Sequence, residues 1–277
     1  MADAPARILF AGDLVGSAGR RTLLGLLPTL REQHAPTFVI ANAENVAGGL
    51  GITPRIADEL LEAGVDVITL GNHAYRRREI LGYLDKTERV VRPANYLRSQ
   101  PGRGDTIVER DGVRLGVVNL SGNLFVHAAH PLFQEAEAAL SRLEGRVDHI
   151  LVDVHAEATS EKVALGWFLD GRVTAVVGTH THVPTADARV LPGGTAYITD
   201  VGMTGARGGV LGVRREQAIE SLRTQLSVRF EPSEEDPWLN AVLITASSPL
   251  LADSIDQVLL PYRPSTATNS GPSSQGR

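Results

Sequence analysis

The chain has 277 residues, 43% hydrophobic and 21% charged, so it is long enough for a full hydrophobic core and differs from disordered or fibrous proteins. Its 27 Lys and Arg residues against 32 Asp and Glu residues give a formal net charge of -5, which argues against a chain-wide basic surface for duplex nucleic acid. Cysteine is absent, which excludes disulfides, thiolate-ligated metal sites and a cysteine nucleophile. Any metal must therefore be held by oxygen and imidazole nitrogen.

The first residues lack the basic segment and long apolar segment of a signal peptide. The sequence also contains no apolar run of the roughly 18 residues that a membrane span needs. We therefore expect a soluble cytoplasmic protein that does not act at a membrane.

Short apolar runs of strand length recur along the chain and are mostly apolar on both alternating faces, as in strands buried between two layers. The predicted strands are Ile8–Ala11, Phe38–Ala41, Val65–Leu70, Leu115–Leu120, His149–Val154, Ala175–Gly178 and Ala196–Thr199. Helical patterns fill the gaps, and Pro28 is predicted to break or kink the first helix. The predicted helices are 20–34, 54–63, 133–144 and 160–170.

The pattern changes after about Arg214. A helix is predicted over Glu216–Leu226. It is followed by three predicted strands of an antiparallel closing sheet, which are Val228–Glu231, Leu239–Ala246 and Ile255–Tyr262. Residues 264–277 are a low-complexity polar segment and are predicted to be a disordered tail. Residues 1–263 are therefore predicted to form one α/β domain.

Most of the predicted strands lead directly into Asp, Asn, Glu or His. Open α/β sheets place their functional sites at the carboxyl ends of strands, so these polar residues are candidates for a common site. They include Asp13, Asn42, Glu44, Asn45, Asn72, His73, Asn119, Asp153, His155, His180, His182 and Asp200.

Each of these signals also has a simpler interpretation. In an extended segment His180 and His182 point to the same side and could share one metal or two adjacent metals, but they could also be surface histidines. Glu44 after a buried strand needs a cation or a hydrogen-bond network, although an Asx-turn into the Gly48–Gly51 loop would also explain it. His155 alone is most simply a hydrogen-bonded core histidine.

The combination favours a metal site, because strand ends that share an edge converge. Carboxylate and amide oxygens with imidazoles suit Mn, Fe, Zn or Co without choosing among them. One carboxylate between two cations can bridge them at about 3.5–4 Å, holding a hydroxide nucleophile and clamping a phosphoryl group. Five motifs follow in order along the chain: Gly12-Asp13, Asn42-Ala43-Glu44-Asn45, Gly71-Asn72-His73, His155 and Gly178-Thr179-His180-Thr181-His182.

This series resembles the calcineurin-like metallophosphoesterases. Glu44-Asn45 stands in place of the usual bridging aspartate motif, which is similar to the bacterial YmdB-like branch, and the resemblance covers roughly residues 7–260. It implies a four-layer α/β/β/α sandwich of two mixed sheets with two bound metal ions, iron by resemblance and otherwise manganese or zinc. It also implies a ligand set and a general acid: Asp13, Glu44, Asn45 and His182 for the first metal, Glu44, Asn72, His155 and His180 for the second, and His73 as the acid.

By this resemblance the chain is expected to hydrolyse 2′,3′- or 3′,5′-cyclic nucleotides. Metal-bound hydroxide would attack phosphorus while His73 protonates the departing ribose oxygen. The alternatives are a phosphomonoesterase or protein phosphatase with the same metals, a non-phosphoryl metallohydrolase, and a regulator that binds a cyclic nucleotide or RNA without turnover. RNA ends, RNA-processing proteins and further copies of the chain are the other partners we expect.

Two segments, Ala74–Arg78 and Ala206–Gly209, depart from the branch and are expected near the mouth of the site, where they would affect substrate preference. The arginines at 76–78 could attract a phosphate or an RNA end, but such a run is more often a solvated helix start. His127 and His130 are candidates for lining the pocket.

Overall fold

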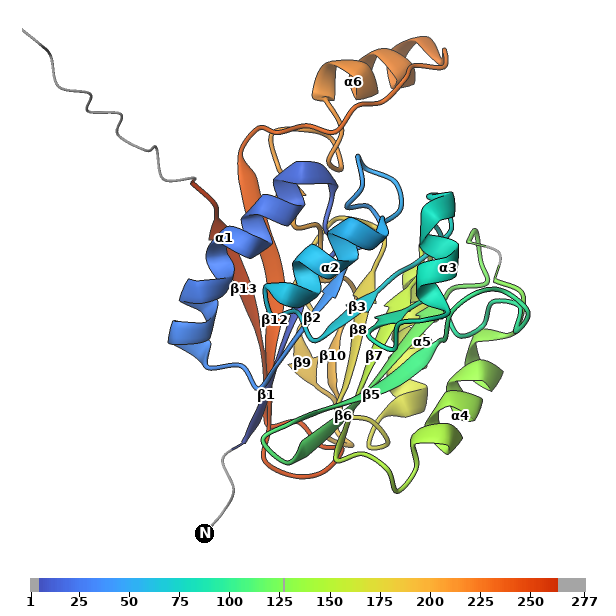
Figure 1. The fold of residues 1–277 in the computed structure, drawn as a ribbon, viewed down its shortest axis with the longest axis vertical. Helices are drawn as coiled ribbons and strands as arrows, with labels where there is room; N and C mark the ends of the chain where they lie inside the picture. The colour runs from blue at the N-terminus through green and yellow to red at the C-terminus, as the bar shows by residue number, and fades with distance from the viewer. Residues whose placement is uncertain (1–4, 127, 264–277) are drawn as a thin grey trace, which may run out of the picture.

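Two β-sheets are stacked face to face, and helices cover their outer faces (Figure 1). This computed structural model describes residues 5–126 and 128–263, so the predicted tail at 264–277 and His127 lie outside the described residues. Within these ranges no helix combines the length and the apolar character that crossing a membrane requires.

The first sheet combines strands from both ends of the chain. Its order is β11-β12-β1-β2-β3-β4, with β13 pairing with β12. The strands β1 to β4 run parallel, whereas β12 is antiparallel to both β1 and β13. Two of the three predicted antiparallel closing strands, Leu239–Ala246 and Ile255–Tyr262, are therefore confirmed. The strands are β1 (Ala6–Ala11), β2 (Phe38–Asn42), β3 (Val67–Thr69), β4 (Val90–Val91), β11 (Gly205–Ala206), β12 (Pro237–Ala246) and β13 (Ser254–Pro261).

The second sheet comes from the middle of the chain, in the order β5-β6-β7-β8-β10-β9. Its four central strands are parallel, and β5 and β9 are antiparallel at the two edges. The strands are β5 (Asp105–Arg110), β6 (Val113–Ser121), β7 (His149–His155), β8 (Ala175–Thr179), β9 (Arg189–Val190) and β10 (Ala196–Ile198).

Three separate apolar cores show that the layers number four. Alternation along β1 sends Leu9 toward the helices of the first sheet and Phe10 toward the second sheet. On the far side, Val152 of β7 packs in the core beneath the helices of the second sheet. The predicted α/β/β/α sandwich of two mixed sheets is therefore confirmed. The helices are α1 (Gly16–His34), α2 (Pro54–Glu62), α3 (Leu81–Leu84), α4 (Leu132–Leu143), α5 (Thr159–Leu169) and α6 (Arg215–Thr224), with a 3₁₀ turn η1 (Arg78–Ile80).

Two predictions about local structure were wrong: Pro28 does not break the first helix, and residues 228–231 do not form a strand. The helix α1 begins at Gly16 and continues through Pro28, which lies on its exposed face, where water can satisfy the carbonyl that loses its N–H partner. The segment 228–231 is not a strand, because it runs from α6 back toward β12 without a strand beside it.

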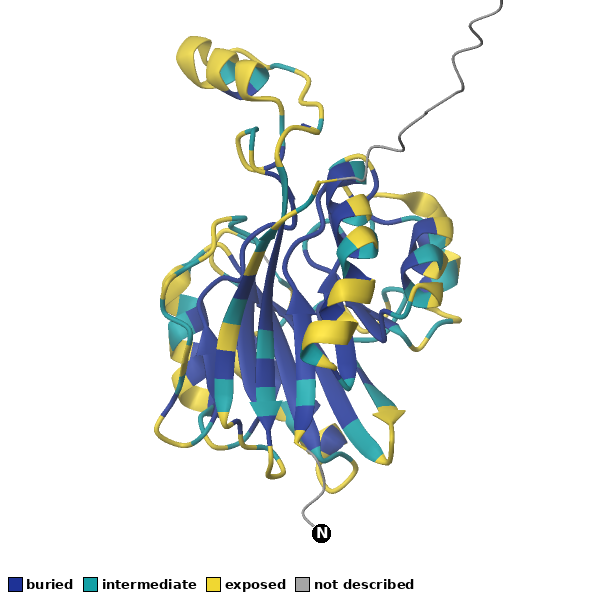
Figure 2. Cartoon of the chain, turned by 90° about the vertical axis from the view of Figure 1, so that its left-hand side faces the viewer, coloured by how far each residue is buried: buried dark blue, intermediate teal, exposed yellow. Residues whose placement is uncertain are grey.

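Residues 207–236, which include α6, form an arm that stands out from the body in Figure 1. Figure 2 shows α6 as mostly exposed, and Ala218 is its single buried residue. The base of the arm is closed by two backbone hydrogen bonds, from Arg207 N–H to Asp236 O and from Gly208 N–H to Glu235 O, each 3.0 Å long. The two chain segments at the base of the arm are thus held together next to the body.

Candidate metal centre

The candidate site lies where the carboxyl ends of strands from both sheets meet. Asp13, Glu44 and Asn72 follow β1, β2 and β3 of the first sheet, whereas His155 ends β7 and His180 follows β8 of the second. Contacts between these residues cross the interface between the sheets. The expected convergence of strand-end residues is therefore present, and two sheets contribute to it.

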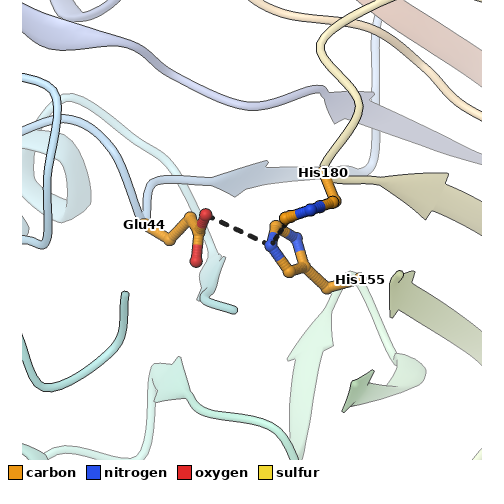
Figure 3. Close-up of side chains that lie close together, drawn as sticks. All are labelled: Glu44, His155 and His180. Atoms are coloured by element: carbon orange, nitrogen blue, oxygen red, sulfur yellow. Dashed lines mark hydrogen bonds and ion pairs between the residues drawn. The ribbon is translucent and has the colours of Figure 1, made fainter. Parts of the chain in front are cut away.

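Glu44, His155 and His180 form the centre of the cluster (Figure 3). His155 Nε2 lies 3.1 Å from Glu44 Oε1 and 3.0 Å from His180 Nδ1, and the three potential ligand atoms lie within 4.8 Å of one another. Asn72 Oδ1 is 2.9 Å from the same His155 nitrogen. Four of the predicted ligands thus direct oxygen or nitrogen atoms at one small volume.

The close approach of these side chains explains the glycine of the Gly71-Asn72-His73 motif. A Cβ atom at Gly71 would lie 2.5 Å from Glu44 Oε2 and would also overlap the His155 ring. Only glycine fits there, because any side chain would displace a member of the cluster.

Asp13, Asn45 and His182 are the remaining predicted ligands, and each contacts a member of this cluster. Asp13 is fully buried. Its Oδ2 accepts a hydrogen bond from the backbone N–H of His180 at 3.1 Å, whereas its Oδ1 has no hydrogen-bond partner in the described part of the chain. Asn45 Nδ2 lies 3.1 Å from Glu44 Oε1 and 3.2 Å from His182 Nε2. Asn45 would have to turn its amide to offer oxygen here, but the orphaned Asp13 oxygen already fits a cation.

Burial and charge set the protonation of the cluster. Burial raises the pKa of Glu44, but the charges and hydrogen bonds of His155 and His73 outweigh it and hold that pKa well below its usual value. Burial lowers the pKa of His155, but Glu44 and Asp13 raise it to about 9. Burial and the charge of His155 lower the pKa of His180 to about 4. A cation at this centre must displace the His155 proton, so its binding is expected to strengthen as pH rises.

The backbone of the His180–His182 segment differs from the prediction. The strand β8 ends at Thr179, and the φ angles of His180 and His182 are +100° and +65°, so the segment is not extended. Both imidazoles still line the same cavity, because two left-handed residues turn the chain at this point. Left-handed histidines are uncommon, and such strained conformations persist where the surrounding structure fixes them.

A buried ion pair fixes this strained segment. Asp200 Oδ2 accepts hydrogen bonds from Thr181 N–H at 3.1 Å, from Thr181 Oγ1 at 2.8 Å and from the buried Lys162 ammonium at 2.7 Å. Its Oδ1 accepts the N–H of Gly202. The predicted strand-end residue Asp200 therefore belongs to the frame of the site and does not face the cluster centre. Sequence reasoning gave Lys162 no role, although a lysine inside an otherwise apolar helix face was a usable signal.

A second buried carboxylate orients His155. Thr179 Oγ1 donates to Asp153 Oδ1 at 2.7 Å and lies 2.9 Å from His155 Nδ1. Because the Thr179 hydroxyl donates its proton to Asp153, its oxygen accepts a hydrogen bond from His155 Nδ1–H. His155 Nε2 is therefore free to face Glu44. Asn42 and Thr69 donate to the other oxygen of Asp153. Asn42 and Asp153, both strand-end candidates, thus act on the cluster through the orientation of His155.

Comparison with known proteins identifies the family. A family model described as "YmdB-like protein" matches residues 9–258. A 2′,3′-cyclic-nucleotide 2′-phosphodiesterase of Bacillus subtilis (strain 168) is 48% identical over 238 residues, covering 86% of this chain and 90% of that protein. The chain belongs to the YmdB-like family.

Solved structures agree with this assignment. A hypothetical protein from Thermus thermophilus superposes with a TM-score of 0.86 at 39% identity, covering 93% of this chain and 100% of that chain. A phosphatase from Mycoplasma pneumoniae superposes with a TM-score of 0.87 at 33% identity, covering 94% of this chain and 95% of that chain. This YmdB-like chain has the metallophosphoesterase type of fold and is a phosphoesterase.

The two segments that depart from the YmdB-like branch have different surroundings. Arg77 donates hydrogen bonds to the carbonyls of Ala47 and Leu50 and so fixes the glycine loop at the mouth of the site. Arg76 and Arg78 are exposed, and Arg78 begins η1, as a solvated helix start predicts. The second segment, Ala206–Gly209, forms the start of the arm. His130 is not among the residues that line the cavity over the cluster, so that expectation was wrong.

Proposed function

We propose that the protein hydrolyses 2′,3′-cyclic nucleotides at the bond to the 2′ oxygen, with two bound divalent cations. The observation that carries the proposal is the cluster of Glu44, His155 and His180, whose ligand atoms lie within 4.8 Å of one another. Beside it lies an Asp13 oxygen that has no hydrogen-bond partner among the described residues. The Bacillus subtilis relative, 48% identical, is named for this reaction.

The proposed ligand sets are those that the family resemblance implies, and the contacts of Glu44 support them. Glu44 Oε1 contacts both His155, from the second set, and Asn45, from the first, so we assign Glu44 the position between the two cations. The donors offer oxygen and imidazole nitrogen without thiolate, which suits iron, manganese or zinc and does not decide among them. The first set is Asp13, Glu44, Asn45 and His182, and the second is Glu44, Asn72, His155 and His180.

Bound cations would neutralise charge that develops on the phosphoryl oxygens and would lower the pKa of water at the site. In the proposed reaction water adds to phosphorus and the bond from phosphorus to the 2′ oxygen breaks. The 2′ oxygen leaves with a proton from the protein, and the product is a nucleoside 3′-monophosphate.

His73 is the residue that we propose as the source of that proton. Its backbone N–H donates to Glu44 Oε2 at 2.9 Å, which fixes the residue beside the cluster. With the Asn45 amide as it lies in the structure, His73 Nδ1 is 2.7 Å from Asn45 Oδ1. Its Nε2 makes no hydrogen bond within the described part of the chain, and the ring lines the cavity. An imidazole with one free nitrogen beside the cluster meets the requirement for a general acid.

Rates on a panel of substrates test the proposal. The panel contains 2′,3′-cyclic AMP, 3′,5′-cyclic AMP, a linear diester and a nitrophenyl monoester, each assayed with manganese, with iron and with a chelator. We expect the highest kcat/KM on the 2′,3′-cyclic substrate, release of adenosine 3′-monophosphate, and loss of activity with the chelator. A preference for the monoester would instead favour a phosphatase, the description of the Mycoplasma pneumoniae relative.

A further inference from the structure

The cavity over the cluster has two chemically different walls. It has a volume of about 410 Å³, and one wall carries the polar side chains of the candidate centre together with Glu157 and Thr181. The apolar wall is formed by the remaining large side chains of the lining, Val15, Leu50, Leu211, Val213, Phe230 and Pro232. A cavity of this size with a few convergent polar groups and an apolar wall is typical of a small-molecule site.

Three large apolar side chains of this wall are exposed to solvent. The exposed fractions are 51% for Phe230, 52% for Leu211 and 46% for Leu50. Exposed apolar groups gathered at one site commonly mark a binding surface, since water contact there is unfavourable. Phe230 is the single aromatic residue among them, and it makes no aromatic pair within the described residues.

The base of the arm holds Phe230 in place. Pro232, two residues further on, forms a bridge with Val213, and the Arg214 N–H donates to Glu231 O at 3.0 Å. Pro232 also packs against the body, where its Cγ would lie 3.3 Å from a Cβ atom at Gly49. Phe230 is therefore held close to the glycine loop, which supplies Leu50 to the same wall.

The two walls are also fixed relative to each other. His182, a proposed ligand, lies with its Nδ1 3.0 Å from the carbonyl oxygen of Leu211 on the apolar wall. The spacing between the cluster and the apolar wall is thus set by a direct hydrogen bond. A substrate whose phosphate lies at the cluster would therefore place its remaining groups against the apolar wall.

We infer that Phe230 is the platform on which the nucleobase of the substrate stacks. This inference rests on the proposed function, since it takes the phosphate to lie at the cluster. The six side chains of the apolar wall carry no hydrogen-bonding group, so the wall can stack a base but cannot read its edge. Stacking on an aromatic ring accepts any base, because every base has a π face. The enzyme therefore takes cyclic nucleotides of all four bases, with purines favoured through their larger stacking area.

Kinetics of Phe230→Ala and Phe230→Tyr test the inference on two substrates, 2′,3′-cyclic AMP and the base-free 1-O-methylribose 2,3-cyclic phosphate. We expect Phe230→Ala to raise KM for the adenine substrate about tenfold with kcat within twofold of wild type. It should leave the base-free substrate unchanged, and Phe230→Tyr should behave as wild type. Phe125→Ala is the matched control, because Phe125 is 75% exposed and lies outside the cavity lining.

An equal loss on both substrates, or no loss on either, would overturn the inference. Calorimetric binding of adenosine 3′-monophosphate and of base-free methylribose 3-phosphate separates this failure from failure of the proposed function. If wild type hydrolyses no cyclic nucleotide but Phe230→Ala still weakens adenosine 3′-monophosphate about tenfold, the reaction is wrong and the platform stands. If Phe230→Ala binds both compounds as wild type does, the platform is wrong.

Discussion

The strand β7 carries one buried histidine at each end, and the pKa values of the two are shifted in opposite directions. His149 begins the strand and is 6% exposed, whereas His155 ends it and is fully buried. Each Nδ1 lies near a threonine hydroxyl from the neighbouring strand region, 3.3 Å from Thr174 for His149 and 2.9 Å from Thr179 for His155. Both are thus buried histidines of the same strand, each with its Nδ1 beside a threonine hydroxyl.

Their neighbours separate them. Burial lowers the pKa of His149, and the partly exposed Asp148 offsets this only in part. His155 is buried more deeply, yet Glu44, Asp13 and Asp153 raise its pKa. Burial alone therefore gives a neutral structural histidine, and carboxylates gathered at the carboxyl ends of strands turn a similar residue into a cation ligand candidate.

The largest loss of activity is expected when the carboxylate that distinguishes His155 from His149 is removed. Glu44→Gln removes the charge that faces His155, so the cluster should lose cations. Loss of several kcal/mol of charge stabilisation corresponds to a fall in kcat/KM of about 10⁴-fold. Elemental analysis of the purified variant should show fewer than two cations per chain. Full cation content at wild-type rate would show that Glu44 is not the shared ligand.

The second-largest effect is expected from removing the proposed proton donor while the cations stay bound. His73→Gln should keep the cation content of wild type and lower kcat on 2′,3′-cyclic AMP by about 10²- to 10³-fold, because the leaving oxygen is no longer protonated. A diester with a nitrophenolate leaving group, which departs without a proton, should lose far less. Equal losses on the two substrates would remove His73 from the role of general acid.

A pair of matched variants compares the two threonines. Thr179→Val breaks the link from Asp153 to His155 and should weaken cation binding about 10- to 100-fold, as loss of an orienting contact behind a ligand does. Thr174→Val removes the corresponding hydroxyl beside His149 and should leave cation affinity unchanged. Titration of each variant with manganese measures the difference. Similar affinities would mean that the Thr179 hydroxyl does not orient His155.

The smallest effect is on the pH dependence of stability. Burial lowers the pKa of His149 from 6.5, so the unfolded chain takes up a proton at this residue more readily than the folded protein. The stabilisation is present above pH 6.5 and is lost as pH falls through the folded pKa. His149→Gln should therefore flatten the decline of Tm between pH 7.5 and 5. A decline that persists in His149→Gln would contradict this.

Much of the fold could be predicted from the sequence because its parallel strands are buried on both faces. Runs such as Phe38–Ala41 and Ala175–Gly178 can be recognised by composition alone. The edge strand β5, Asp105–Arg110, was missed because its polar, half-exposed residues form a strand only by pairing with β6. The segment 228–231 was misjudged for the opposite reason, since its composition suits a strand but the described residues offer it no partner strand.

The polar cluster could be predicted because parallel strands bring their carboxyl ends to one edge. What could not be predicted lies in the supporting contacts. Thr179, Lys162 and Leu211 act through neighbours far away in the chain, and no local spacing reports such contacts. The left-handed backbone of His180 and His182 likewise depends on Asp200. A single domain, a homo-oligomer, RNA partners and a cytoplasmic location stay predictions.

Anomalous diffraction from crystals grown with manganese would locate the cations themselves. We predict two peaks about 3.5–4 Å apart, with a Glu44 carboxylate oxygen between them. His155 Nε2 should face one peak and Asp13 the other. A single peak, or peaks away from Glu44, would contradict the claim that the strand ends of the two sheets build a two-cation centre.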